Sequence, residues 1–175
     1  MINSDKVGER SMKKKILTIL VLLALITPCF TFNVMAVDAY EQVEIKKFDK
    51  NLSYLANDLE MMSNRVGSLY PNSWLAFPNM DFGDISPTSI TALSSARASY
   101  GTGLNFHLDD PNGPIIAFVP LEPVDFSVGE PKTAPLNMKV TGVHTIYVRS
   151  VTGTLNAWYF QFNAPPAKEF SYDTY

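Results

Sequence analysis

Proline and glycine interrupt the chain at short intervals from residue 37 onward, and this punctuation limits the elements that can form between them. The intervening runs are short and rich in β-branched and aromatic residues, which favour strands. Many short strands with a turn roughly every ten residues are typical of a β-sandwich or a β-barrel. The sequence therefore predicts an all-β fold, either a sandwich or a barrel. Strands are expected at 42–48, 73–77, 89–98, 104–108, 115–119, 135–140, 143–149 and 157–163.

The segment 51–66 carries apolar residues at helical spacing instead. They recur every three or four residues, as on one face of an amphipathic helix, at Leu52, Leu55, Leu59, Met62 and Val66. A long loop whose apolar residues pack locally would satisfy the same spacing. Both a helix and a loop therefore stay open for this segment.

The first 36 residues are typical of an export signal. A lysine run at 13–15 precedes an apolar run from Ile16 to Ile26, and Val34-Met35-Ala36 offers a small-x-small cleavage site. The apolar run is shorter than the roughly 20 residues that a membrane-spanning helix needs. We therefore expect cleavage after Ala36 and a secreted protein, with attachment to the cell surface as an open option. Residues 1–11 precede this signal, and Met12 offers an alternative start.

The expected mature chain divides into one domain at 37–164 and a C-terminal tail at 165–175. The only cysteine, Cys29, lies in the expected signal, so the domain must be stabilised by packing without disulfides. The formal net charge of the whole chain is −3, and it becomes more negative without the lysine-rich signal. This balance argues against nucleic acid or an anionic membrane as the partner.

The domain carries few of the residue patterns that catalysis needs. His107 and His144 are the only histidines, and neither has a second histidine or a cysteine at metal-ligand spacing. No serine stands in a nucleophile-elbow context, and no glycine-rich phosphate loop follows a strand. Asp109 and Asp110 precede Pro-Asn-Gly-Pro and most simply serve a turn. A glycosidase would need two facing carboxylates, which no motif indicates. We therefore predict that the protein is not an enzyme.

Two stretches near the C-terminus, GVHTIYV at 142–148 and LNAWYFQF at 155–162, resemble the closing strands of family 6 carbohydrate-binding modules. Three further stretches, at 42–49, 66–83 and 108–116, resemble the opening strand, the second block and the central hairpin of that family. The matches follow the family's order and cover nearly the whole expected domain.

The resemblance implies a non-catalytic β-jelly-roll that binds a plant or microbial polysaccharide, usually xylan or another β-glycan. Such modules are often tethered to a glycoside hydrolase, so a separately encoded hydrolase is an expected partner. Their main site lies in the loops at one end of the sandwich, where an aromatic pair grips a sugar ring and an asparagine bonds its hydroxyls. A flat aromatic ring covers the apolar C–H face of a sugar, and an amide both donates and accepts at its polar rim.

The family's site residues carry over unevenly. Asn156 matches the binding asparagine, although a strand-start asparagine that satisfies a turn fits the same position. The family's tyrosine falls on Ser68, so Tyr70 is the candidate for that aromatic wall. The family's loop tryptophan falls near Phe126, which is the candidate for the other wall.

An acidic residue of the family's first long loop has two candidates, Asp58 and Glu60. Trp74 corresponds to a tryptophan that the family buries, so we expect it in the core. The alternative function is that of a diverged jelly roll that has lost sugar binding and serves as a cell-surface or protein-interaction module. The structure of the segment 51–66 discriminates between these two functions. A helix over the sandwich end would cover the sugar site, whereas an open loop would form its rim.

The family's modules often hold a structural calcium ion between an acidic residue of the first strand and an aspartate of the last. Lys46 and Trp158 stand in those two positions. An ammonium about 4 Å from a divalent cation would be repelled by roughly 8 kcal/mol at an effective dielectric near 20. We therefore expect no calcium and no other cofactor, with Lys46 paired to Glu44 and packing around Trp158 in place of the ion.

Overall fold

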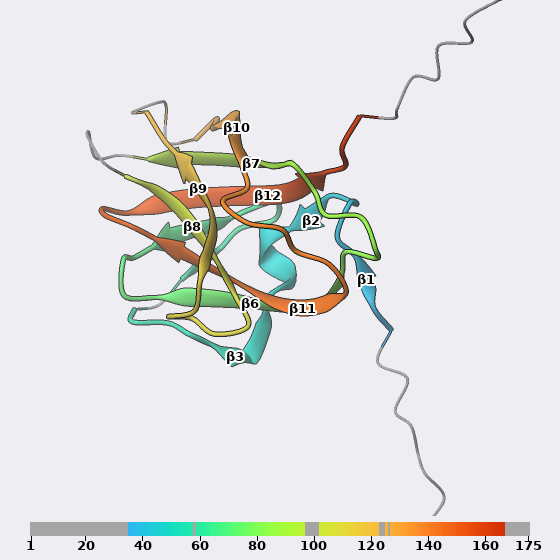
Figure 1. The fold of residues 1–175 in the computed structure, drawn as a ribbon. Helices are drawn as coiled ribbons and strands as arrows, with labels where there is room; N and C mark the ends of the chain where they lie inside the picture. Colours follow the sequence, from blue (N-terminus) through green and yellow to red (C-terminus); the bar gives the residue numbers. More distant parts are fainter. Residues whose placement is uncertain (1–34, 58, 97–101, 123–124, 126, 167–175) are drawn as a thin grey trace, which may run out of the picture. The chain divides into compact units, whose positions relative to one another are not determined.

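Two six-stranded β-sheets face each other across a hydrophobic core (Figure 1). The computed structural model describes residues 35–57, 59–96, 102–122, 125 and 127–166. In chain order its elements are β1 (Val37–Asp38), β2 (Val43–Glu44), the 3-10 helix η1 (Ile45–Lys47), β3 (Asp49–Tyr54), β4 (Glu60–Met61), β5 (Val66–Leu69), β6 (Trp74–Asp81), β7 (Ser89–Ala96), β8 (Gly103–Leu108), β9 (Ile115–Pro120), β10 (Glu130–Pro135), β11 (Val143–Ser150) and β12 (Leu155–Asn163).

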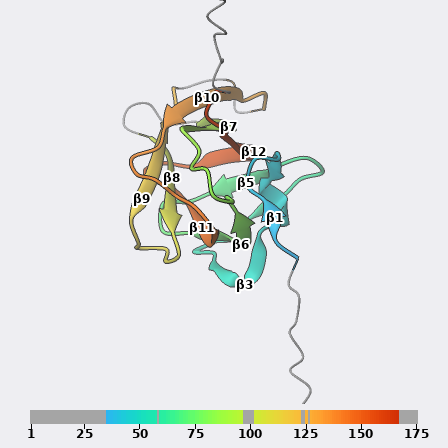
Figure 2. The same ribbon diagram turned by 45° about the vertical axis from the view of Figure 1, so that its right-hand side comes forward.

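The first sheet has the strand order β1-β6-β11-β8-β9, and β3 also pairs with β6. The second has the order β10-β7-β12-β5-β4, and β2 also pairs with β12. Every pair is antiparallel except β1 with β6. Figure 2 shows β7, β10 and β12 in one layer and β3, β6 and β11 in the other. The predicted all-β sandwich is therefore confirmed, and the expected export signal lies outside the described residues apart from its last two.

The core is built from the inward residues of both sheets, and aromatic rings dominate its centre. Phe160 of β12 meets Phe77 of β6 edge to face, with ring centroids 4.9 Å apart. Phe162 meets Phe82 in the same way at 4.8 Å. Edge-to-face pairs of this kind add stability beyond the apolar area that they bury. Phe160 and Phe162 are two residues apart, so they point to the same face of β12 and both pack against the opposite sheet.

Most of the expected strands form close to their predicted positions. The runs at 89–98, 104–108, 115–119, 143–149 and 157–163 overlap β7, β8, β9, β11 and β12, and the run at 73–77 overlaps the beginning of the longer β6. The run at 42–48 is only partly a strand, since η1 follows β2 directly.

The strand expected at 135–140 is wrong, because the strand in this region is β10, which ends at Pro135. Its prolines, Pro131 and Pro135, lack the backbone N–H that a central strand needs. β10 pairs only with β7, so it forms the edge of its sheet, where proline is tolerated.

The helix considered for 51–66 does not form. β3 pairs with β6, and β4 pairs with β5 as a short hairpin. Hydroxyl groups hold this arrangement: Ser53 Oγ accepts a hydrogen bond from Ala76 N at 2.8 Å, and Ser73 Oγ accepts one from Ala56 N at 3.0 Å. Pairing with neighbouring strands therefore overrides the helical spacing of the apolar residues.

Trp74 is not part of the buried core, contrary to expectation. It is half-buried on the outer face of β6, because Leu75 and Phe77 take the inward positions. Its ring lies 4.9 Å from that of Tyr54, and Arg149 Cζ lies 5.9 Å from its centroid. Its indole N–H donates to Leu52 O at 3.2 Å.

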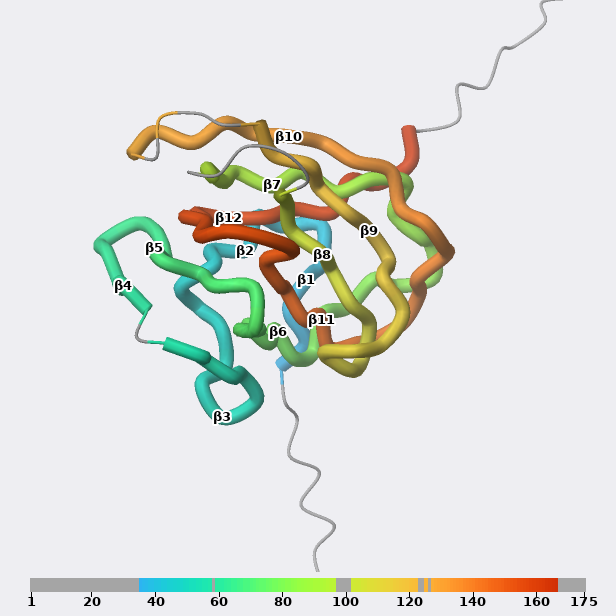
Figure 3. The backbone as a smooth tube through the Cα atoms, turned by 90° about the vertical axis from the view of Figure 1, so that its left-hand side faces the viewer, coloured from blue at the N-terminus to red at the C-terminus, as the bar shows by residue number. Residues whose placement is uncertain are grey.

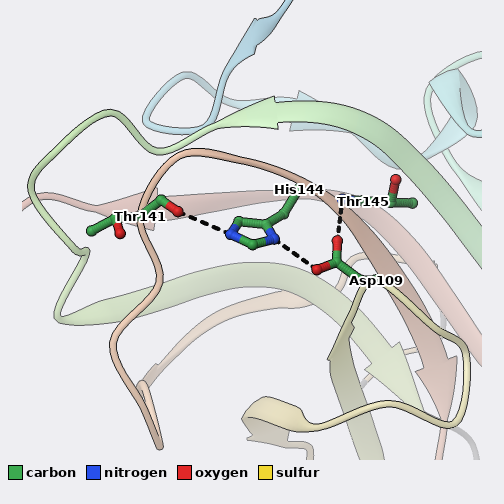
Figure 4. A network of polar contacts seen from close by, with 4 residues as sticks. All are labelled: Asp109, Thr141, His144 and Thr145. Carbon is green, nitrogen blue, oxygen red and sulfur yellow. Dashed lines mark hydrogen bonds and ion pairs between the residues drawn. The ribbon is translucent and has the colours of Figure 1, made fainter.

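His144 ties the start of β11 to two neighbouring loops (Figure 4). Its Nδ1 lies 2.8 Å from Asp109 Oδ2, and its Nε2 lies 2.9 Å from Thr141 O. Asp109 Oδ1 accepts a further hydrogen bond from Thr145 N at 3.0 Å. Both ring nitrogens thus lie within hydrogen-bonding distance of oxygen atoms. The contacts assign His144 and Asp109 to holding loops together.

Candidate functional site

A cavity of about 560 Å³ lies at one end of the sandwich. Figure 3 shows the β4–β5 hairpin beside the beginning of β12 at this end. The walls come from that hairpin, the end of β5, the turn at 125–129 and the β11–β12 turn. The lining residues are Glu60, Met62, Arg65, Ser68, Tyr70, Asp125, Ser127, Thr154 and Asn156. Segments far apart in the sequence thus converge on one hollow.

Asn156 lies at the cavity's inner end. It is the second residue of β12, opposite Ser95 of β7, at a point where the pairing of β12 with β5 is irregular. The side chain is fully buried and still lines the cavity. A Cβ on Gly67 would lie 3.0 Å from Asn156 Oδ1 and 3.2 Å from Glu60 Oε2. Glycine at this position therefore lets the amide and the carboxylate approach the same backbone.

Tyr70 is the only aromatic residue that lines the cavity within the described ranges. It is half-buried and follows β5, two residues after Ser68. Ser68 has φ 58°, in the left-handed region that non-glycine residues seldom adopt. Backbone strain of this kind clusters at ligand-binding sites, although it is also found elsewhere. At this part of the wall the chain has the small hydroxyl of Ser68 in place of the family's tyrosine ring.

Two carboxylates lie at the rim, both exposed to solvent: Glu60 on β4 and Asp125 in the turn at 125–129. Asp125 Oδ1 accepts hydrogen bonds from Ser127 Oγ at 2.6 Å and from Ser127 N at 2.8 Å. These bonds, that of the hydroxyl first, lower the pKa of Asp125 below its ordinary value. The ionised carboxylate is an acceptor for hydroxyl donors on a ligand.

The sequence model of the family described as carbohydrate binding module family 6 matches residues 39–164, which is most of the chain. The chain belongs to carbohydrate-binding module family 6. The match confirms the resemblance found in the sequence. Modules of this family bind carbohydrate and are not catalytic.

Solved family 6 modules share the fold. CsCBM6-3 from Clostridium stercorarium in complex with cellobiose is 21% identical with a TM-score of 0.64, over 74% of this chain and 98% of the other. A module from Clostridium cellulolyticum in complex with xylose is 22% identical with a TM-score of 0.63, over 73% and 99%. A β-1,3-glucan-binding module from Bacillus halodurans is 15% identical with a TM-score of 0.61, over 74% and 99%. The comparison with curated proteins gives no match.

The family 6 module brings together three of the residues expected at its site. Asn156, Tyr70 and Glu60 come from β12, the end of β5 and β4, and they line the same cavity. Phe126 and Asp58 lie outside the described residues. Of the two acidic candidates, Glu60 therefore lines the cavity, whereas the position of Asp58 is not described.

Several cavity residues were not expected at the site from the sequence, namely Met62, Arg65, Asp125, Ser127 and Thr154. They lie mostly in turns, where spacing carries no periodic signal. Only the Asp-x-Ser pattern at 125–127 could have been recognised, because aspartate commonly bonds the backbone two residues further on.

The position of the family's calcium ion does not fit a cation in this chain. Lys46 Nζ lies 3.0 Å from Glu44 Oε2 and donates to Ser63 O at 2.9 Å. The hydrogen bond from Lys46, followed by that from Lys47, lowers the pKa of Glu44. The ion pair expected between Lys46 and Glu44 is therefore present, and the Lys46 ammonium also holds Ser63 O. Trp158 supplies no oxygen ligand.

Neither a metal cluster nor a membrane-spanning helix is found in the part of the chain that the structure describes. No three histidine, cysteine, aspartate or glutamate side chains group there as metal ligands. No helix in the same ranges has the length and apolar character needed to cross a membrane.

Proposed function

We propose that the protein is a secreted, non-catalytic module that binds a β-glycan such as xylan through the cavity at the sandwich end. The observation that carries this proposal is the convergence of Asn156, Tyr70 and Glu60, from three separate elements, on one open cavity. The hairpin at 60–67 supports it further, because Glu60 and Met62 line the cavity rather than closing it. An open rim is what a polymer needs, since its chain must continue beyond the bound sugar.

The lining residues match the chemistry of a sugar ring. Tyr70 offers an aromatic face for the C–H face of one residue. The Asn156 amide, the hydroxyls of Ser68 and Thr154, and the carboxylates at the rim supply donors and acceptors for hydroxyl groups. Tyr70 is a single ring from the described wall, so affinity should be modest, with dissociation constants between about 1 µM and 1 mM.

A hydrolytic role is disfavoured by the environment of the two rim carboxylates. A glycosidase needs one carboxyl whose pKa is raised, so that it can protonate the leaving oxygen. The pKa of Asp125 is instead lowered by Ser127, and Glu60 is exposed to water. Catalysis on the glycan would then belong to a separately encoded glycoside hydrolase, the partner that the family resemblance suggests.

Ser68 favours the second candidate function, a diverged module that contacts proteins or the cell surface without binding sugar. Replacing a ring by a hydroxyl at position 68 removes one wall of the family's aromatic pair. The half-buried Tyr70, two residues further on, still lines the cavity and keeps the first proposal ahead.

Binding to insoluble glycans tests the first proposal against the second. The protein should be retained on xylan, cellulose or β-1,3-glucan, and Asn156→Ala and Tyr70→Ala should each reduce retention at least about tenfold, equivalent to ~1.4 kcal/mol. Asn163→Ala is the matched control. It lies at the other end of β12, where its amide donates to Ser89 Oγ and Thr91 Oγ1 at 3.0 Å. Absence of retention on all three glycans by the folded protein would support the interaction module.

A further inference from the structure

Arg65 joins two turns that both contribute to the cavity wall. It ends the turn at 62–65, which is closed by a hydrogen bond from Met62 N to Arg65 O at 3.0 Å. Its Nη1 donates to Ser127 O at 3.4 Å, in the turn at 125–129. Both Arg65 and Ser127 line the cavity. One side chain therefore bridges two segments that the backbone does not connect locally.

Trp158 provides the surface on which the guanidinium rests. Arg65 Cζ lies 5.2 Å from the centroid of the ring, within the range of a cation–π contact. Trp158 falls where the pairing of β12 with β7 is irregular, between Ala157 and Tyr159, and its side chain is 8% exposed. A Cβ on Gly129 would lie 2.8 Å from the ring, so the second turn packs directly against it.

The turn at 62–65 is also held from its other side. Lys46 Nζ donates to Ser63 O at 2.9 Å and pairs with Glu44 at 3.0 Å. Two cationic side chains thus fix one turn, with Lys46 tying it to the start of the domain and Arg65 tying it to the turn at 125–129.

The contact with Trp158 is the main attraction that acts on the Arg65 guanidinium. Among the described residues, Arg65 Nε is buried without a hydrogen-bond partner, which is unfavourable for a charged group. The hydrogen bond to Ser127 O is long. The cation–π contact with the indole therefore carries most of the attraction, and a lysine ammonium reproduces the charge but not the broad guanidinium group.

We propose that Arg65 is a positioning residue of the binding cavity. Lying over the ring of Trp158, it fixes the turn at 125–129 relative to the β4–β5 hairpin and thereby sets the separation of the rim carboxylates, Asp125 and Glu60. The part of this inference that concerns affinity rests on the proposed glycan-binding function. The part that concerns the two turns does not.

Amide hydrogen exchange of the intact protein measures the turn directly. Val128 N and Gly129 N donate to Asp125 O at 3.1 and 3.3 Å, so their exchange rates report the closure of this turn. In Arg65→Gln we expect both amides to exchange about tenfold faster, since a partly desolvated cation–π contact is lost. Arg65→Lys should show part of the same increase, because it keeps the charge but loses the broad guanidinium group that contacts the ring and reaches Ser127 O.

Arg149→Gln is the matched control. Arg149 lies 5.9 Å from the ring of another tryptophan, Trp74, and donates to Pro111 O at 2.9 Å. It belongs to the other sheet and does not line the cavity. We expect it to leave exchange at Val128 and Gly129 unchanged.

Glycan affinity is the second readout, measured on whichever of xylan, cellulose or β-1,3-glucan the wild-type protein binds. Arg65→Gln should weaken it severalfold, and Arg149→Gln should not. The inference is overturned if Arg65→Gln leaves exchange at Val128 and Gly129 unchanged, if Arg149→Gln accelerates it equally, or if the turn loosens while affinity stays the same. A wild-type protein that binds no glycan would remove the proposed function, and exchange alone would then decide whether Arg65 holds the turns.

Discussion

At the scale of single residues, Gly67 leaves little room for a side chain beside two cavity residues, Asn156 and Glu60. A Cβ there would lie 3.0 Å from Asn156 Oδ1, whose side chain is fully buried, and 3.2 Å from two atoms of the exposed Glu60. Glu60 can move away, but the buried amide has little room. Gly67→Ala should therefore lower the free energy of unfolding by about 1 kcal/mol and weaken glycan binding. Denaturant titration and affinity electrophoresis measure the two effects.

The control for Gly67→Ala is the same substitution in an Asn156→Ala background. Removing the amide removes the closest contact, so the second substitution should cost clearly less there. Equal costs in both backgrounds would mean that the amide does not restrict position 67.

His144, near the beginning of β11, permits a second prediction at this scale. Replacing it by alanine removes the contacts with Asp109 Oδ2 and Thr141 O. The pair is partly exposed, so solvent screening limits the effect, and we expect a loss of about 1 kcal/mol in the free energy of unfolding. Asp109→Asn should cost less, because asparagine tolerates the positive φ of 60° and can still accept from Thr145 N. Urea titration of both variants tests the order, and a larger loss in Asp109→Asn would contradict it.

At the scale of elements, the turn at 125–129 should respond to acid. The pKa of Asp125 is lowered in the folded protein, chiefly by the Ser127 hydroxyl. The stabilisation is therefore present above the ordinary value of 3.8 and is lost as the pH falls through the lower folded value. The amide resonance of Ser127 should shift with pH below 3.8. In Asp125→Asn this titration should disappear, and a titration that persists in the variant would assign it to another group.

The segment 51–66 and β10 show why some elements were not predictable from local patterns. Leu52 and Leu55 have helical spacing, yet they are 45% and 39% exposed, so the pattern does not describe a buried face. The serine and asparagine residues of the segment compete with helix formation, and this signal could have favoured strands or turns; they are Asn51, Ser53, Asn57, Ser63 and Asn64. At β10 the strand was expected too late in the sequence, at 135–140, and the edge position of the real strand allows its two prolines.

At the scale of the whole molecule, the strands that were predicted correctly are those whose alternation reflects burial on one side. β7 and β12 cross the centre of their sheet, and their inward residues face the core regardless of loop structure. The cavity could be predicted only through Asn156, Tyr70 and Glu60, whose positions follow from the family pattern. Arg65 and Ser127 act across turns that are distant in sequence, and no local rule indicates such contacts.

The thermal stability of the whole domain should be independent of calcium. An ion that bound only the folded state at one hundred times its dissociation constant would add about 2.7 kcal/mol, which corresponds to a rise of several degrees in Tm. The Lys46 ammonium, 3.0 Å from Glu44 Oε2, opposes such binding. Differential scanning calorimetry with excess calcium and with a chelator should therefore give Tm values within roughly 1 °C of each other.

Lys46→Glu places a second carboxylate beside Glu44, so calcium should raise the Tm of this variant. Lys47→Glu is the matched control, because Lys47 also pairs with Glu44, at 3.3 Å, but does not hold Ser63. A calcium-dependent Tm in the wild-type protein would mean that the ion binds despite Lys46.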